Sequence, residues 1–268
     1  MNTIHHMPTT GGTIISKAIA ACTHSILLSE INPYGFIKHP KKDVGFRPTA
    51  LVEHAVGASG DLDRALKKQY FIQQLHLCQK HAKAKNKSLI LREHSYTAFN
   101  LANKNSALLT ILDEGEHDVR SVLSIRHPLD SFISSQKKGW HKKLAPNTKT
   151  LDEYCQNLTV FVDYMLARPH CLLMRYEDFC VDPLVEVSRA GKFYGLTVDP
   201  NDLAKAMEIP ASGFSGRKSN KIEVRRRQEV SEELLETAQT AKEYRVFCER
   251  FGYEPAPEKA PINAGARI

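Results

Sequence analysis

The sequence predicts an α/β fold, a doubly wound parallel sheet flanked by helices. Three observations lead to this prediction. Short apolar runs of strand length recur along the chain, longer segments of helical character separate them, and basic or polar residues directly follow several of the runs. In such sheets ligands bind beyond the carboxyl ends of the strands. The residues that follow each apolar run are therefore the first place to look for function.

The apolar runs predict strands, and the segments between them predict helices. Strands are expected at residues 3–7, 25–29, 88–92, 120–125 and 171–175. Helices are expected at residues 12–21, 61–83, 128–138, 150–167, 183–194 and 231–251. No internal repeat is present, so these elements fit a single domain over residues 1–253. The Pro-rich segment 254–268 is expected to form a mobile C-terminal tail.

Composition excludes several classes of protein. Of the 268 residues, 42% are hydrophobic and 25% are charged, which is ordinary for a globular chain and excludes a disordered or fibrous protein. No apolar run approaches the ~20 residues of a membrane span, and the N-terminal residues lack the pattern of a secretion signal. We therefore expect a cytoplasmic protein without a membrane span.

Neither a metal site nor nucleic-acid binding is expected. The six cysteines are scattered without metal-ligand spacing, and the twelve histidines form no His-x-x-x-His pair. The net charge is +7, and much of the basic excess lies in residues 137–143 and 216–227. These runs belong to no recognised nucleic-acid-binding module. A small polyanionic ligand explains them better than nucleic acid does, and a solvated surface is the simplest alternative.

The loop after the first expected strand is a candidate phosphate-binding loop. Gly11 and Gly12 allow backbone amides to curl around an oxyanion, and the following helix adds the partial positive charge of its N-terminus. Thr10 and Thr13 add hydroxyl donors. The loop is not a Walker A loop, because Thr13 and Ile14 follow the last glycine where a Lys and a Ser or Thr would stand. A plain strand–helix turn capped by threonine is the alternative.

Titratable residues end the second and third expected strands. Arg92, Glu93 and His94 follow one another at the end of the third strand. A histidine at the rim of an anion-binding sheet is suited to general base catalysis, although a lone histidine there is more often a surface residue. Glu30, at the end of the second strand, is a rival base, and structural capping explains it nearly as well. Glu93 is a weaker third choice.

Arg126 follows the fourth expected strand and precedes a helix that Pro128 can open. Ser134 lies eight positions later, about two turns into that helix, where it could reach a phosphate that Arg126 also binds. Asp130 is expected to favour the helix N-terminus, where a carboxylate is stabilised. The segment indicates a second anion site at the same end of the sheet.

Taken together, these segments resemble the sulfotransferases that use 3′-phosphoadenosine 5′-phosphosulfate (PAPS), particularly their bacterial branch. The resemblance covers nearly the whole chain and implies the P-loop NTPase-like sulfotransferase fold. In that family the first loop, here Thr9 to Ile14, holds the 5′-phosphosulfate. An arginine with a serine eight positions later holds the 3′-phosphate, which implies this role for Arg126 and Ser134.

Three further segments are similar to that family. "RYEDF" resembles a segment whose tyrosine lies near the adenine, here Tyr176, although a helix-capping turn would look the same. "GFSGRKSNKI" resembles the basic loop that closes over the 3′-phosphate, which implies Arg217 and Lys218. "LREHS" resembles the Lys-x-His segment of cytosolic members, which implies His94 as the base and Arg92 in the place of the lysine.

The first loop departs from the family pattern. Most relatives carry a lysine or arginine near the position of Thr9 or Thr10, where it stabilises the bridging oxygen during sulfuryl transfer. Neither residue is basic here. Arg92, Lys17 or a residue of the late basic loop could take this role, or the protein could be slow or inactive in sulfuryl transfer.

The sequence therefore predicts an enzyme that transfers a sulfuryl group from PAPS to a hydroxyl or amine and releases 3′,5′-ADP without a metal ion. The acceptor is a small molecule or a glycan, and a glycan, a lipid and a small alcohol all stay open, as does the oligomeric state. A non-catalytic protein that binds 3′,5′-ADP or PAPS is one alternative. A nucleotide-dependent kinase of related fold is another, and it would require Mg²⁺ and a Walker lysine.

Overall fold

The computed structural model describes residues 1–34, 63–93, 104–137, 149–208, 222 and 230–256. Within them, five strands form one parallel sheet in the order β2-β3-β1-β4-β5. The strands are β1 (Asn2–His6), β2 (Ile26–Ile31), β3 (Leu89–Glu93), β4 (Arg120–Ile125) and β5 (Cys171–Arg175). This arrangement confirms the predicted doubly wound sheet, and each expected strand is shifted by at most two residues at either end.

The strand order brings two loops together. After β1 the chain turns toward β2 and β3 on one side, and after β3 it crosses to β4 on the other side of β1. β1 and β4 are paired in register, with His6 opposite Ser124. The loops that leave these two strands therefore diverge from a shared crevice, which is where doubly wound sheets bind their ligands.

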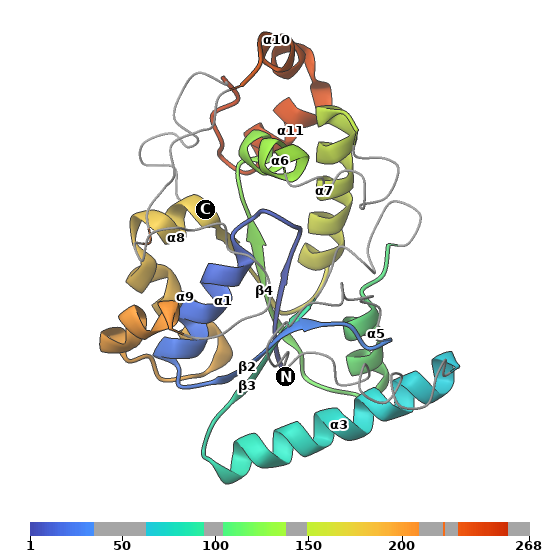
Figure 1. Ribbon diagram of the computed structural model, residues 1–268, viewed down its shortest axis with the longest axis vertical. Helices are drawn as coiled ribbons and strands as arrows, with labels where there is room; N and C mark the ends of the chain where they lie inside the picture. Colours follow the sequence, from blue (N-terminus) through green and yellow to red (C-terminus); the bar gives the residue numbers. More distant parts are fainter. Residues whose placement is uncertain (35–62, 94–103, 138–148, 209–221, 223–229, 257–268) are drawn as a thin grey trace.

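Helices cover both faces of the sheet (Figure 1). One face packs on α1 (Gly12–Cys22), α8 (Tyr176–Val181), α9 (Pro183–Tyr194) and the 3₁₀ helix η2 (Pro200–Met207). The other packs on α3 (Arg64–Ala84), α5 (Ala107–Glu114), α6 (Pro128–Lys137), α7 (Leu151–Leu166) and α11 (Lys242–Arg250). Val122 and Leu123, adjacent in β4, enter the two cores, because successive strand residues point to opposite faces.

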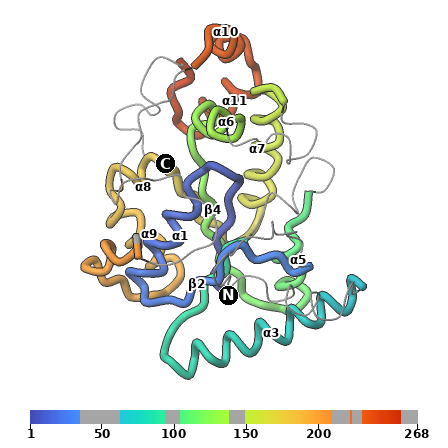
Figure 2. The backbone as a smooth tube through the Cα atoms, in the orientation of Figure 1, coloured from blue at the N-terminus to red at the C-terminus, as the bar shows by residue number. Residues whose placement is uncertain are grey.

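The C-terminal helical region differs from the prediction. A single helix over 231–251 is wrong, because the chain forms α10 (Glu232–Thr240) and then α11, separated by Ala241. Ala241 has φ −63° and ψ 109°, an extended conformation that ends one helix and begins the next. The bend lets Tyr244 and Phe247 enter the core beside α7. α10 lies at the opposite end of the molecule from α3 (Figure 2).

The expected tail begins with residues that are attached to the body. His127 donates from Nε2 to the carbonyl of Glu254 at 3.0 Å, and the hydroxyl of Tyr244 donates to the carbonyl of Pro255 at 2.8 Å. Residues 257–268 lie outside the described part, so the mobility of the tail stays a prediction there, as does the single-domain division.

Two properties of the described residues bear on the class of protein. None of the described helices combines the length and apolar character that a membrane crossing needs. All six cysteines are free, and Cys22, Cys155, Cys180 and Cys248 are buried, as expected for thiols that pack in the core.

Candidate active site

The first loop holds its glycines in close contact with two aromatic rings. Gly11 has φ 86°, in the left-handed region that favours glycine, and a Cβ there would lie 2.1 Å from the ring of Tyr176. A Cβ on Gly12 would lie 2.1 Å from the ring of His6. Both positions therefore require glycine, and the backbone runs closely against the surrounding side chains.

The N-terminus of α1 has no side-chain cap among the described residues, and its first turn contains no acidic residue. Thr10, which could have capped the helix, donates instead to the carbonyl of Met7 at 2.7 Å, so the threonine-capped turn is wrong, whereas the hydroxyl donation by Thr10 to a ligand stays a prediction. Uncapped amides and the helix dipole together favour an anion at this position.

Thr9 is fixed to α6. Its Oγ1 donates to the carbonyl of Ser131 at 2.8 Å, and its φ of 69° is unusual for a β-branched residue. Strain of this kind persists only where the surrounding contacts hold it, and it is often found at functional sites. The side chain of Thr9 is thus engaged within the protein, and being a threonine it brings no charge to the loop.

Arg92 is buried, 1% exposed, and reaches the first turn of α1. Its Nη1 donates to Oγ1 of Thr13 at 3.2 Å and lies 3.0 Å from Nε2 of His6. Nδ1 of His6 is 2.9 Å from the carbonyl of Met7, so Nδ1 carries the proton and Nε2 accepts from Arg92. The pair His6 and Arg92 positions the start of α1. The sequence analysis assigned no role to His6, although it is the last residue of a strand that a glycine loop follows.

Glu30 is bound to Arg92. Its Oε1 accepts from Nη2 of Arg92 at 2.7 Å, and Ser29 accepts from Nε of the same guanidinium at 2.9 Å. A register shift between Leu28 and Ile31 and a φ of 61° at Glu30 turn this carboxylate toward the arginine. The rival base is therefore engaged in an ion pair, which makes it less suited to accept a proton.

Glu93 holds α5. Its carboxylate lies 2.9 Å from Nδ1 of His5 and accepts from the hydroxyl of Ser106 and the amide of Leu108. Burial alone would raise the pKa of Glu93, but these contacts outweigh it and lower the pKa below its ordinary value. Glu93 is therefore a structural anion, and its assignment as a third candidate base is wrong. His94, which follows it, lies outside the described residues and stays a prediction.

Arg126 lies between the first loop and Tyr176. Its Nη1 donates to the carbonyl of Thr9 at 3.2 Å, and its Cζ lies 5.0 Å from the centre of the Tyr176 ring. Its Nε is buried and has no hydrogen-bond partner among the described residues. A buried donor without a partner is rare and calls for a ligand or a water. Between Pro128 and Ser135, Ser134 alone is not fully buried.

Tyr176 is buried against Gly11 and beneath Arg126, so it supports both elements. Its predicted place near an adenine stays a prediction, as do the roles of Arg126 and Ser134. Arg217 and Lys218 lie outside the described residues.

Two hydroxyls beside Arg126 were missed by the sequence analysis. Oγ of Ser131 and Oη of Tyr154 are buried without a hydrogen-bond partner among the described residues. Burial raises the pKa of Tyr154 well above its ordinary value, and the hydroxyls of Ser131 and Thr9 and the charge of Arg126 oppose this rise. Tyr154 therefore lies within electrostatic reach of Ser131, Thr9 and Arg126. Tyr154 belongs to α7, and no local pattern connects it to Arg126 in sequence.

One group of side chains in the described part has the composition of a metal site. Ligand atoms of His24, Asp199 and Asp202 lie within 4.8 Å of one another. Asp202 pairs with Lys205 at 2.5 Å and with His24 at 3.4 Å, and Asp199 accepts from the amide of Asn201. These oxygens have protein partners, and the group is separate from the loops at the carboxyl end of the sheet.

Comparison with known proteins identifies the fold. No family model and no curated protein matches the sequence. The chain is similar to the sulfotransferase domain of the olefin synthase from Synechococcus PCC 7002, with a TM-score of 0.52 and 14% identity over 94% of each chain. It is also similar to a sulfotransferase from Alicyclobacillus acidocaldarius, with a TM-score of 0.42 and 12% identity over 77% of this chain and 89% of that one. A mouse sulfotransferase, SULT7A1, complexed with PAP, gives a TM-score of 0.40 and 12% identity over 82% of this chain and 70% of that one.

The first of these similarities shows the fold of the chain. The chain has the sulfotransferase fold, as the resemblance in sequence implied.

Proposed function

We propose that the protein is a sulfotransferase that transfers a sulfuryl group from PAPS to a hydroxyl or amine of a small-molecule or glycan acceptor. The observation that carries the proposal is the buried Nε of Arg126, which has no hydrogen-bond partner in the described part of the chain and lies beside the loop that leads to the N-terminus of α1. Two anion-binding elements side by side match a ligand with two separate anionic groups.

Each element has a distinct task in this proposal. Arg126 and Ser134 bind the 3′-phosphate, and the amides from Gly11 to Thr13 bind the 5′ end of the nucleotide, because the amide of Ile14 donates to the carbonyl of Gly11 at 3.1 Å. PAPS, when bound, supplies an activated sulfuryl group. Arg92 holds Thr13 and His6 in place at the start of α1. His94, next after β3, accepts the proton of the acceptor.

A calorimetric comparison of two nucleotides tests the 3′-phosphate assignment. The protein should bind 3′,5′-ADP roughly 30- to 150-fold more tightly than adenosine 5′-diphosphate, because a charge-assisted contact to the 3′-phosphate is worth about 2–3 kcal/mol. Arg126→Gln should abolish the preference. Arg120→Gln, at the other end of β4, is the matched control and should keep it. Equal affinities of the wild type for both nucleotides would refute the assignment.

A non-catalytic nucleotide-binding protein is the second candidate. The observation that favours it is that neither Thr9 nor Thr10 is basic, so the loop itself has no cation, and the side chains of both residues are engaged within the protein. Turnover with any acceptor in a screen with isotopically labelled PAPS would exclude this candidate. We expect turnover with PAPS to continue in the presence of EDTA. A loss of turnover that Mg²⁺ restores would favour the alternative of a nucleotide-dependent kinase.

A further inference from the structure

Helix α1 is buried on almost every side. Within Gly12–Cys22, only Thr13 and Lys17 are partly exposed. Residues four apart lie on the same face of a helix, and helical side chains tilt toward the N-terminus. Lys17 therefore lies one turn after Thr13 on the single open strip of this helix, a position from which a lysine side chain can reach the uncapped first turn.

The charge that acts on Lys17 from the described residues is positive. The guanidinium of Arg92 contacts Thr13, and the N-terminus of the helix adds a partial positive charge. Burial and, to a lesser extent, the charge of Arg92 lower the pKa of Lys17, and no carboxylate among the described residues opposes this effect. Arg92 has Glu30 as a counterion, but Lys17 has no ion-pair partner among the described residues. A cation in such surroundings is stabilised when an anion binds beside it.

The alternative cation in the described part is already engaged. Arg92 contacts Ser29, Glu30, His6 and Thr13, and it is almost fully buried. Moving it toward a ligand would break these contacts and leave Glu30 without its counterion. Lys17 has a flexible side chain and makes no such contacts with the described residues.

We propose that Lys17 binds the 5′-phosphosulfate end of the nucleotide and supplies there the positive charge that Thr9 and Thr10 lack. This inference rests on the proposed function. In the transfer, a bond forms between the acceptor oxygen or nitrogen and sulfur, the bond from sulfur to the 5′-phosphate oxygen breaks, and the general base takes the proton of the acceptor. Lys17 stabilises the electron pair that remains on the 5′-phosphate oxygen.

Binding of two nucleotides separates this role from the 3′-phosphate site. Calorimetry should compare 3′,5′-ADP with adenosine 3′-monophosphate, which lacks the 5′-phosphate. Lys17→Gln should weaken the binding of 3′,5′-ADP about 10- to 100-fold, because one charge-assisted contact is lost, and should leave the binding of adenosine 3′-monophosphate unchanged. Lys17→Arg should retain most of the affinity. Lys80→Gln, an exposed lysine of α3, is the charge-matched control and should bind both as the wild type does.

The possible outcomes distinguish the two proposals. If the wild type binds neither nucleotide, the proposed function fails and this inference fails with it. If the wild type binds 3′,5′-ADP and Lys17→Gln leaves its affinity unchanged, or weakens both nucleotides equally, the role of Lys17 is refuted while the proposed function stands.

A labelling experiment on the wild-type protein covers the case in which Lys17→Gln does not fold. Acetic anhydride acylates neutral lysines, and the fraction of Lys17 that is modified can be measured by peptide mass spectrometry. We expect 3′,5′-ADP to protect Lys17 and adenosine 3′-monophosphate to leave it reactive. Equal labelling of Lys17 with and without 3′,5′-ADP would overturn the inference.

Discussion

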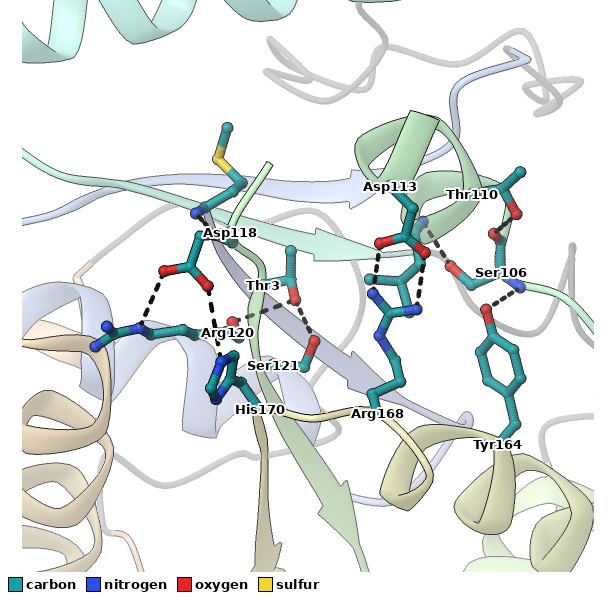
Figure 3. A network of polar contacts seen from close by, with 12 residues as sticks. Thr3, Ser106, Thr110, Asp113, Asp118, Arg120, Ser121, Tyr164, Arg168 and His170 are labelled. Atoms are coloured by element: carbon teal, nitrogen blue, oxygen red, sulfur yellow. Dashed lines mark hydrogen bonds and ion pairs between the residues drawn. The ribbon is translucent and has the colours of Figure 1, made fainter. Parts of the chain in front are cut away.

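The two ends of the sheet hold their charged residues in opposite ways. At the amino end, where β4 and β5 begin, the ion pairs lie in water. Nε of Arg120 is 3.7 Å from Asp118, and the other carboxylate oxygen of Asp118 is 4.0 Å from His170, as Figure 3 shows. The three side chains are 41%, 66% and 57% exposed in that order. Exposed pairs of this kind contribute about 0–1 kcal/mol each, so the loss of one should change the free energy of unfolding only slightly.

At the carboxyl end the charges are buried. Arg92 is paired with Glu30 beneath the first turn of α1, and Arg126 keeps a buried Nε without a partner in the described part. Removing charged groups from water costs several kcal/mol, and a buried ion pair is weak evidence for stability. The difference between the two ends supports the proposal that the carboxyl end binds a charged ligand, whereas the ion pairs at the amino end stay in contact with water.

The largest effect on catalysis should come from replacing His94, which follows β3 in the sequence, and a histidine at the amino end of the sheet serves as the comparison. His94→Ala should lower kcat by about 10²- to 10⁴-fold and leave the affinity for 3′,5′-ADP nearly unchanged, because a general base acts on the transition state. His170→Ala, at the amino end, should leave kcat unchanged. Steady-state kinetics and calorimetry measure both quantities. If Glu30→Gln shows the loss and His94→Ala does not, the base has been assigned to the wrong residue.

A buried carboxyl at the carboxyl end should make stability depend on pH. Burial raises the pKa of Glu177 to about 7, although Arg126 and the amide of His127 oppose the rise. The folded state therefore prefers the protonated acid, and this contribution is fully present below pH ~4.5 and is lost as the pH rises through about 7. The loss amounts to roughly 3 kcal/mol of unfolding free energy.

Glu177→Gln isolates this contribution, because glutamine resembles the protonated acid at every pH. The variant should gain about 3 kcal/mol relative to the wild type between pH 4.5 and 7.5, measured by urea denaturation at each pH. A difference between the two proteins that does not change with pH would contradict the raised pKa.

The smallest effect is expected from replacing one glycine at each end of the sheet with alanine. Gly12→Ala should lower the unfolding free energy by about 1–3 kcal/mol, because its Cβ would lie 2.1 Å from the ring of His6. Gly115→Ala, at the end of α5, is the matched control. Its Cβ would lie 3.2 Å from the side chain of His117, at an exposed turn with negative φ, so little change is expected. Equal losses in thermal or urea unfolding would show that the packing of the first loop is not special.

The sequence predicted the sheet and most of its helices because these depend on local patterns. The apolar runs predict the strands. The rule that ligands bind beyond the carboxyl ends of strands then singles out the glycines after β1 and the arginine after β4 as candidate site residues. The bend at Ala241 was missed because the helical spacing of apolar residues continues across it, and only the packing of Tyr244 on the core requires two helices.

The arrangement within the site depends on tertiary contacts that no local pattern carries. Glu30 turns toward Arg92 because β2 contains a register shift. Glu93 and His94 are adjacent in sequence, yet Glu93 binds His5 and Ser106, a use that only the pairing of β1 with β3 and the position of α5 create. Tyr154 meets Ser131 and Arg126 through the packing of α7 on α6. These residues come together from segments far apart in the chain.

The attachment of residues 253–255 has a practical consequence for truncation. The ring of Tyr253 packs edge-on against His127, with 5.3 Å between centroids, and its hydroxyl donates to Glu177 at 3.2 Å. His127 in turn holds the carbonyl of Glu254, so the last described residues brace the position next to Arg126. A chain that ends at residue 252 would lose these contacts, so we expect Arg126, which precedes His127, to be held less firmly. A chain shortened to residue 256 keeps every one of these contacts, which makes it the safer boundary for an expression clone or a C-terminal tag.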